Sequence, residues 1–196
     1  AMEGLDERLR EVERQRPAGL VIRSGKNGFI AGADVSEFGQ VREPSAAVPS
    51  IRAAHGVLQR LEDLPFPTVA AINGYCLGGG LELAMACRHR VGADDPKVTL
   101  GLPEVMLGIH PGFGGTVRAV RLVGVAPAMD LMLTGKNLRP DKALQVGLVD
   151  EVVPAGQLLD AAKMLALHPR TRCRAPLSQR VLNLPLVRGL VAGRIE

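Results

Sequence analysis

A repeated unit constrains the fold of this sequence more than any other feature: a short apolar run leads through a glycine-rich loop into a helix. The unit occurs three times, with apolar runs at residues 20–22, 68–72 and 98–104. Runs this short and apolar are typical of buried parallel strands, and their alternation with helices indicates an α/β protein. The local pattern alone favours an open parallel sheet, and 196 residues suffice for one domain or slightly more.

Amphipathic periodicity predicts the helices that would cover such a sheet. Residues 42–49 are expected to form a surface stretch outside the helices, and Arg118 and Arg121 are expected to face outwards. Helices are predicted at residues 3–16, 50–63, 81–87, 117–122, 127–133, 141–146 and 158–167, with a last strand at residues 148–153.

Composition narrows the classes of function. Aromatic residues make up only 3% of the chain, which argues against a surface that stacks nucleic-acid bases. The three cysteines form no Cys-x-x-Cys pair, so we expect a reducing compartment and neither a disulfide framework nor a zinc site. No stretch of 18 uncharged apolar residues occurs, so we expect a cytoplasmic protein without a membrane span. The net charge of +4 suits an anionic small ligand without requiring one.

Three places in the sequence could carry chemistry. Gly78–Gly80 precede a helix, where backbone N–H groups can stabilise an oxyanion, although close packing of the helix would explain the glycines equally well. Glu82 lies inside that helix, where it could simply complement the helix dipole. Glu104 follows an apolar strand and could simply face water. Together, two carboxylates and backbone donors suit proton transfer around an acyl group.

Three segments also carry a resemblance to a known family. They are residues 30–34 (Ile-Ala-Gly-Ala-Asp), 77–83 (Leu-Gly-Gly-Gly-Leu-Glu-Leu) and 102–116, which includes Leu-Pro-Glu and Pro-Gly-Phe-Gly-Gly-Thr. In type, order and spacing they resemble the enoyl-CoA hydratase/isomerase (crotonase) family, over residues 18–154. The last segment looks most like the N-terminal hydratase part of a bacterial multifunctional fatty-acid oxidation protein.

The resemblance implies a crotonase (ClpP-like) spiral of ββα units with two roughly perpendicular sheets, instead of the open sheet that the local pattern favours. It implies a crotonase core over residues 1–157 and a C-terminal helical region or linker over residues 158–196. It also implies that the core is incomplete at its N-terminus, because relatives have further strands before the helix that opens this chain.

The resemblance further implies a site and a reaction. Glu82 and Glu104 would be the catalytic residues, and the N–H groups of Ala33 and Gly79 would form the oxyanion hole. The enzyme would add water across the 2,3 double bond of a trans-2-enoyl-CoA in fatty-acid β-oxidation and give a 3-hydroxyacyl-CoA. No metal and no tightly bound cofactor are expected, since coenzyme A arrives as part of the substrate. Substrate and CoA contacts are expected from Ala31, Ala33, Asp34, Val35 and Gly79; Ser36 stands where relatives often have lysine.

Other interpretations remain open. Δ3-Δ2-enoyl-CoA isomerisation could use the same site, with Glu104 alone moving the proton. From another class, RNA binding would use a cluster of arginines, and an inactive scaffold would keep the fold without turnover. A homo-oligomer, or covalent linkage to a 3-hydroxyacyl-CoA dehydrogenase domain, is also compatible with the sequence. The arginine cluster comprises Arg170, Arg172, Arg174 and Arg180.

Overall fold

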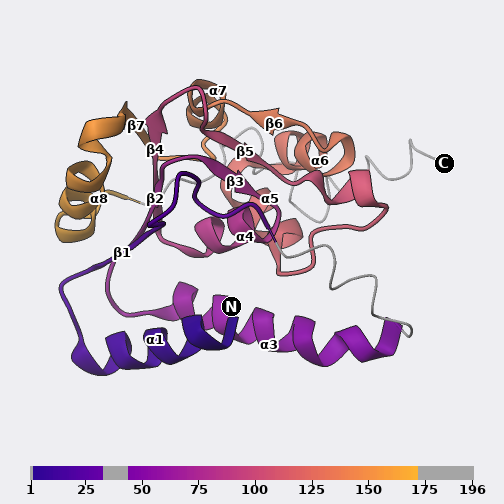
Figure 1. Cartoon of the computed structure of the whole chain (residues 1–196), viewed down its shortest axis with the longest axis horizontal. Coiled ribbons are helices and arrows are strands. Elements are labelled where there is room, and N and C mark those ends of the chain that lie inside the picture. The colour runs from indigo at the N-terminus through magenta and orange to yellow at the C-terminus, as the bar shows by residue number, and fades with distance from the viewer. Residues whose placement is uncertain (1, 33–43, 172–196) are drawn as a thin grey trace, which may run out of the picture.

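A computed structural model of the chain describes residues 2–32 and 44–171 (Figure 1). Within them, helices and strands alternate along most of the chain. The helices are α1 Met2–Gln15, α3 Pro44–Asp63, α4 Gly79–Ala86, α5 Gly115–Val123, α6 Val125–Thr134, α7 Pro140–Gln145 and α8 Leu158–Leu167, with 3-10 helices η1 Pro103–Leu107 and η2 Ala155–Gln157. The strands are β1 Leu20–Arg23, β2 Thr68–Ile72, β3 Tyr75–Leu77, β4 His89–Asp94, β5 Thr99–Gly101, β6 Asn137–Leu138 and β7 Glu151–Pro154.

The strands form two separate sheets. One is entirely parallel, in the order β1-β2-β4-β7, and the other has the order β3-β5-β6, in which β5 and β6 are antiparallel. The single open sheet favoured by the local pattern is therefore wrong. The chain leaves the first sheet after β2 and pairs β3 with β5 instead, so strands β2 to β5 alternate between the two sheets.

Helices cover both sides of the parallel sheet. Helix α8 packs against β2 and β4 on one side, while α4 lies on the other side at the centre of the molecule (Figure 1). Helices α1 and α3 lie side by side below them. All five residues of β2 are buried, as are Gly80–Ala86 of α4, so the N-terminus of α4 lies within the core.

Two predicted boundaries are wrong in informative ways. Residues 44–49 are helical, so α3 begins six residues before the predicted start and contains Pro49. A proline removes one hydrogen bond from a helix and need not end it, and residues 45–47 include good helix formers. The last strand begins at Glu151, because residues 146–150 form a turn and a bend that precede it.

Strand β4 is missing from the sequence-based prediction, because its sequence starts with two residues that are usually exposed. His89 and Arg90 are both fully buried. The Arg90 guanidinium donates to the carbonyl oxygens of Leu148 and Cys87 and to Oδ2 of Asp150, at 2.8–2.9 Å. These partners satisfy the buried charge and fix the turn before β7 against the sheet.

None of the helices in the described ranges is long and apolar enough to cross a membrane. The apolar side chains instead form one continuous core between the sheets and helices. Its largest fully buried members include Leu58, Leu61, Ile72, Leu81, Met85, Leu100 and Leu102.

Candidate active site

Each of the three glycines at the start of α4 lets a different part of the chain approach its backbone closely. A Cβ at Gly78 would lie 3.1 Å from Oε1 of Glu104, and one at Gly79 would lie 3.1 Å from the Phe113 ring. At Gly80 it would lie 2.2 Å from the carbonyl oxygen of Ile30. Gly80 therefore has the structural role that the sequence left open, and Gly78 and Gly79 keep side chains away from the region beside Glu104.

The chain that precedes residue 33 reaches the same place. Ile30 pairs with the strand that leads into α4, since its N–H donates to Tyr75 O and its carbonyl accepts from Leu77 N, each at 2.9 Å. A Cβ at Gly32 would lie 4.0 Å from the nitrogen of Gly79. Gly79 is the first residue of α4, and the first N–H groups of a helix have no acceptor within it. Two glycine-containing bends thus meet at one helix N-terminus.

Not every predicted contact residue is described. Ala31 is exposed beside this bend, and its contact with CoA stays a prediction. Ala33, Asp34 and Val35 lie outside the described residues, so the second oxyanion donor and the other CoA contacts stay predictions.

Glu82 is not a solvated carboxylate on the first turn of a helix, because it is only 1% exposed. Its Oε1 accepts hydrogen bonds from the N–H groups of Phe113 and Gly115, each at 2.7 Å. Burial raises the pKa of Glu82, while these two hydrogen bonds and the nearby Arg118 and His55 side chains oppose the rise. The two hydrogen bonds thus hold the carboxylate in place and offset part of the free-energy cost of removing it from water.

Glu104 lies in η1 beside the N-terminus of α4 and is half-buried. Its Oε2 is inaccessible to solvent and has no hydrogen-bond partner among the described residues. Burial raises the pKa of Glu104; a backbone hydrogen bond within the residue opposes the rise, and the negative charge of Glu82 adds to it. A buried polar atom without a partner is rare in folded proteins and is typical of functional sites.

Sequence reasoning missed two side chains that surround this site. Arg118 is only 7% exposed, so the expectation that it faces outwards is wrong, whereas Arg121 does face solvent. The spacing offered a signal, because Arg118 lies four residues before the buried Leu122 on the same face of α5. His55, which the sequence placed in no site, lies 2.6 Å from the Gly112 carbonyl through Nε2.

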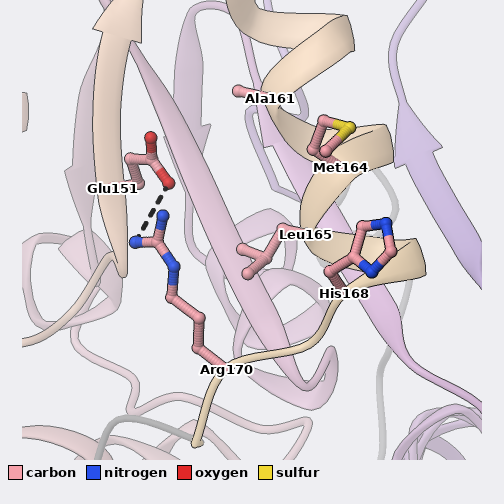
Figure 2. Close-up of a pocket in the computed structure, with 6 residues that line it drawn as sticks. All are labelled: Glu151, Ala161, Met164, Leu165, His168 and Arg170. Atoms are coloured by element: carbon pink, nitrogen blue, oxygen red, sulfur yellow. Dashed lines mark ion pairs between the residues drawn. The ribbon is translucent and has the colours of Figure 1, made fainter.

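Other features of the described residues lie apart from this site. No group of three or more metal-ligating side chains occurs in the part of the chain that the structure describes. A pocket of about 340 Å³ between the end of α8 and β7 contains none of the predicted site residues. Figure 2 shows Arg170 and Glu151 in this pocket, paired at 3.4 Å. Of the four arginines considered for RNA binding, only Arg170 lies among the described residues.

Comparison with known proteins identifies the family. The sequence model described as enoyl-CoA hydratase/isomerase matches residues 2–179. An enoyl-CoA hydratase structure from Bacillus anthracis is 35% identical with a TM-score of 0.77, over 84% of this chain and 64% of that chain. An enoyl-CoA hydratase from Thermoplasma volcanium is 31% identical with a TM-score of 0.78, over 84% and 66% of the two chains. Pseudomonas aeruginosa DspI is 30% identical with a TM-score of 0.79, over 97% and 71%.

The chain therefore spans 64% of the length of the Bacillus anthracis enzyme. The two sheets and the helices around them correspond to the fold of these enzymes, which confirms the crotonase fold that the three sequence segments imply. The chain belongs to the enoyl-CoA hydratase/isomerase family.

Proposed function

We propose that this chain carries the active site of an enoyl-CoA hydratase, which adds water across the 2,3 double bond of a trans-2-enoyl-CoA. The observation that carries the proposal is the pair of carboxylates at the N-terminus of α4, Glu82 and Glu104, in different electrostatic surroundings. Burial raises the pKa of Glu82, but two backbone N–H groups and the guanidinium of Arg118 favour its ionised form. Glu104 has the negative charge of Glu82 nearby, which favours its protonated form.

We base the two roles on the hydrogen bonds that Glu82 accepts and that Oε2 of Glu104 lacks among the described residues. As a carboxylate, Glu82 would accept a proton from water as the water oxygen bonds to C3 of the substrate. As a carboxylic acid, Glu104 would give its proton to C2, and the carbon–carbon double bond becomes single. The product is a 3-hydroxyacyl-CoA, and one proton passes from Glu82 back to Glu104 through solvent before the next cycle.

The helix N-terminus would stabilise the intermediate charge. The Gly79 N–H, with the predicted N–H of Ala33, would donate to the thioester oxygen as negative charge develops there. One such donor is typically worth about 3 kcal/mol in the transition state. Ala31, Asp34 and Val35 would contact the CoA part of the substrate, so the reaction needs no tightly bound cofactor. In this proposal the protein is cytoplasmic and acts in fatty-acid β-oxidation, as a homo-oligomer or joined to a 3-hydroxyacyl-CoA dehydrogenase domain.

Loss of the conjugated thioester absorbance of crotonyl-CoA would test the proposal. We expect Glu82→Gln and Glu104→Gln each to lower kcat by about 10²–10⁴-fold, the usual contribution of a positioned acid or base. Glu7→Gln is the matched control, because Glu7 is exposed on α1 far along the chain from the site. Wild-type rates in either site variant would contradict the assignment.

The same variants separate hydration from isomerisation. An isomerase that moves a proton between C2 and C4 needs only Glu104, so Glu82→Gln would keep its rate with a 3-enoyl-CoA. The two hydrogen bonds that hold Glu82 in place favour the hydratase. Identification of the 3-hydroxyacyl product by mass spectrometry decides between the two reactions.

A further inference from the structure

The loop at residues 111–115 connects Glu82 to a group of charged residues that the proposed reaction does not use. On one side of the loop, the N–H groups of Phe113 and Gly115 both donate to Oε1 of Glu82. On the other side, the carbonyl of Phe113 accepts a hydrogen bond from Nη1 of Arg118 at 2.9 Å. The peptide groups of a short loop segment therefore link an arginine to a buried carboxylate.

Arg118 is itself held in place. Its Nε donates to Oε2 of Glu62 at 2.9 Å, and both side chains are largely buried, at 8% and 13% exposed. Since Glu62 lies on α3 and Arg118 on α5, the pair joins two helices that both pack against α4. A charge-assisted pair shielded from water fixes geometry better than an exposed one.

The loop fits closely between Arg118 and Glu82. A Cβ at Gly114 would lie 2.4 Å from Nη1 of Arg118, and Gly114 has a φ of +95°, which favours glycine. A Cβ at Gly115 would lie 2.8 Å from Oε1 of Glu82. The loop carbonyl of Gly112 is held as well, by Nε2 of His55 at 2.6 Å. The loop thus has little room to move away from either partner.

We propose that Arg118, held by Glu62, is a positioning residue for Glu82: through the loop it fixes the two N–H groups that orient the Glu82 carboxylate for water activation. The inference rests on the proposed hydratase function and goes beyond it, since Arg118 touches neither substrate nor the reacting atoms. Arg118 also contributes positive charge. Together with His55 it opposes the effect of burial on the pKa of Glu82, and Glu104 is the other titratable carboxyl group nearby.

The variants Arg118→Gln and Arg118→Lys test this role, with Arg121→Gln as the matched control. Arg121 lies one turn further along α5, is 68% exposed, and has its Nη1 3.9 Å from Oε1 of Glu62. Arg121→Gln therefore removes the same charge close by without touching the loop. The pKa of the Glu82 side chain is measured by carbon-13 NMR titration of the whole chain, with the signal assigned by Glu82→Gln, and kcat and KM for crotonyl-CoA are measured over the same pH range.

In Arg118→Gln we expect the Glu82 pKa to rise and the acidic limb of the kcat profile to move to higher pH. We also expect kcat to fall by about 10–100-fold, the scale of a misplaced catalytic group, with little change in KM. Arg118→Lys keeps the charge but cannot contact Glu62 and the Phe113 carbonyl with the same planar group. Its Glu82 pKa should therefore be close to that of the wild type, while its kcat should stay lowered. Arg121→Gln should leave all three quantities at their wild-type values.

Two outcomes would overturn the inference. One is a folded Arg118→Gln protein whose Glu82 pKa and kcat equal those of Arg121→Gln. If Arg118→Gln does not fold, Arg118→Lys decides, and wild-type kcat in that variant contradicts positioning by Arg118. If the wild type has no hydratase activity, the proposed function fails while the NMR titration still decides whether Arg118 controls the Glu82 carboxylate.

Discussion

Replacing Gly80 by alanine should separate the helix α4 from the chain that precedes residue 33. The new Cβ would lie 2.2 Å from the Ile30 carbonyl oxygen and 2.7 Å from the Ile30 Cβ. The closest neighbour is a backbone atom, so no side-chain rotation relieves the clash. The segment at Ile30 must move by about 1 Å to restore ordinary contact distances, which are roughly 3.5 Å or more.

The energetic cost follows from the contacts that this movement disturbs. Overpacking in a well-packed region costs about 1–3 kcal/mol. The two hydrogen bonds of Ile30, to Tyr75 O and from Leu77 N, add about 0.5–1.5 kcal/mol each if they break. Alanine returns about 1 kcal/mol through its better helix propensity. We therefore expect a net loss of about 1–5 kcal/mol in the free energy of unfolding.

Urea unfolding followed by circular dichroism measures this loss, with Gly56→Ala as the control. Gly56 lies in α3, and a Cβ there meets no atom within 4 Å, so this variant should gain about 1 kcal/mol. Because Gly32 follows Ile30 by two residues, Gly80→Ala should also lower kcat with crotonyl-CoA by as much as about 10²-fold through misplacement of the oxyanion donors. If Gly80→Ala is as stable as Gly56→Ala, the close approach of Ile30 to α4 is wrong.

Buried polar groups are the basis of three more predictions. Because the pKa of Glu104 is raised in the folded state, its ionisation destabilises the fold above the unfolded pKa of about 4.3, by about 1.4 kcal/mol for each tenfold change in its acid dissociation constant. Glu104→Gln should thus unfold at higher urea than wild type at pH 7, with the difference vanishing below about pH 4; equal midpoints at pH 7 would contradict the buried, unpartnered Oε2. Burial raises the pKa of Asp150, but the hydrogen bond from His89 and the charge of Arg90 outweigh it, so the net pKa is lowered. Asp150 hence stabilises the fold above the unfolded pKa of about 3.9, and Asp150→Asn should cost about 3–5 kcal/mol at neutral pH, a cost that disappears as pH falls through the folded pKa; a loss unchanged at pH 3 would contradict the ion pair. Burial raises the pKa of the Cys76 thiol, so a maleimide should label Cys76 only after unfolding, as mass spectrometry of the labelled peptide would show.

The sequence predicts those elements of the fold whose physical causes are local. The helix α8 and the strands β1 and β2 follow from periodicity and short apolar runs, and their observed bounds agree with prediction to within one residue. Strand β3 has only three residues, too few to show a period. Strand β4 starts with His89 and Arg90, and the buried guanidinium of Arg90 depends on hydrogen-bond acceptors distant in sequence, Leu148 and Asp150.

Some features of the site have local causes that the sequence reveals, and others depend on residues distant in sequence. Glycines before a helix predict its donor N–H groups. The resemblance adds the expected catalytic roles of Glu82 and Glu104. Local pattern could not predict that Gly80 meets Ile30 or that Arg118 meets Glu62, because each pair is more than 45 residues apart in the sequence. The spacing of α5 indicates only that Arg118 shares a face with the buried Leu122. The buried charge of Arg118 is explained by its hydrogen bonds to Glu62 and to the loop at residues 111–115, and a local pattern shows neither.

Helix α4 explains why the loop at residues 111–115 must supply hydrogen bonds to Glu82. Residues 80–86 are all buried, so the helix has no face toward water and cannot turn its single carboxylate outwards. A buried carboxylate without donors would cost the fold several kcal/mol, so the group would instead be protonated, and a protonated carboxyl group cannot accept a proton from water. The N–H groups of Phe113 and Gly115 and the charge of Arg118 oppose that cost. Gly115 is therefore a consequence of burying Glu82, since a Cβ there would lie 2.8 Å from the oxygen to which its N–H donates.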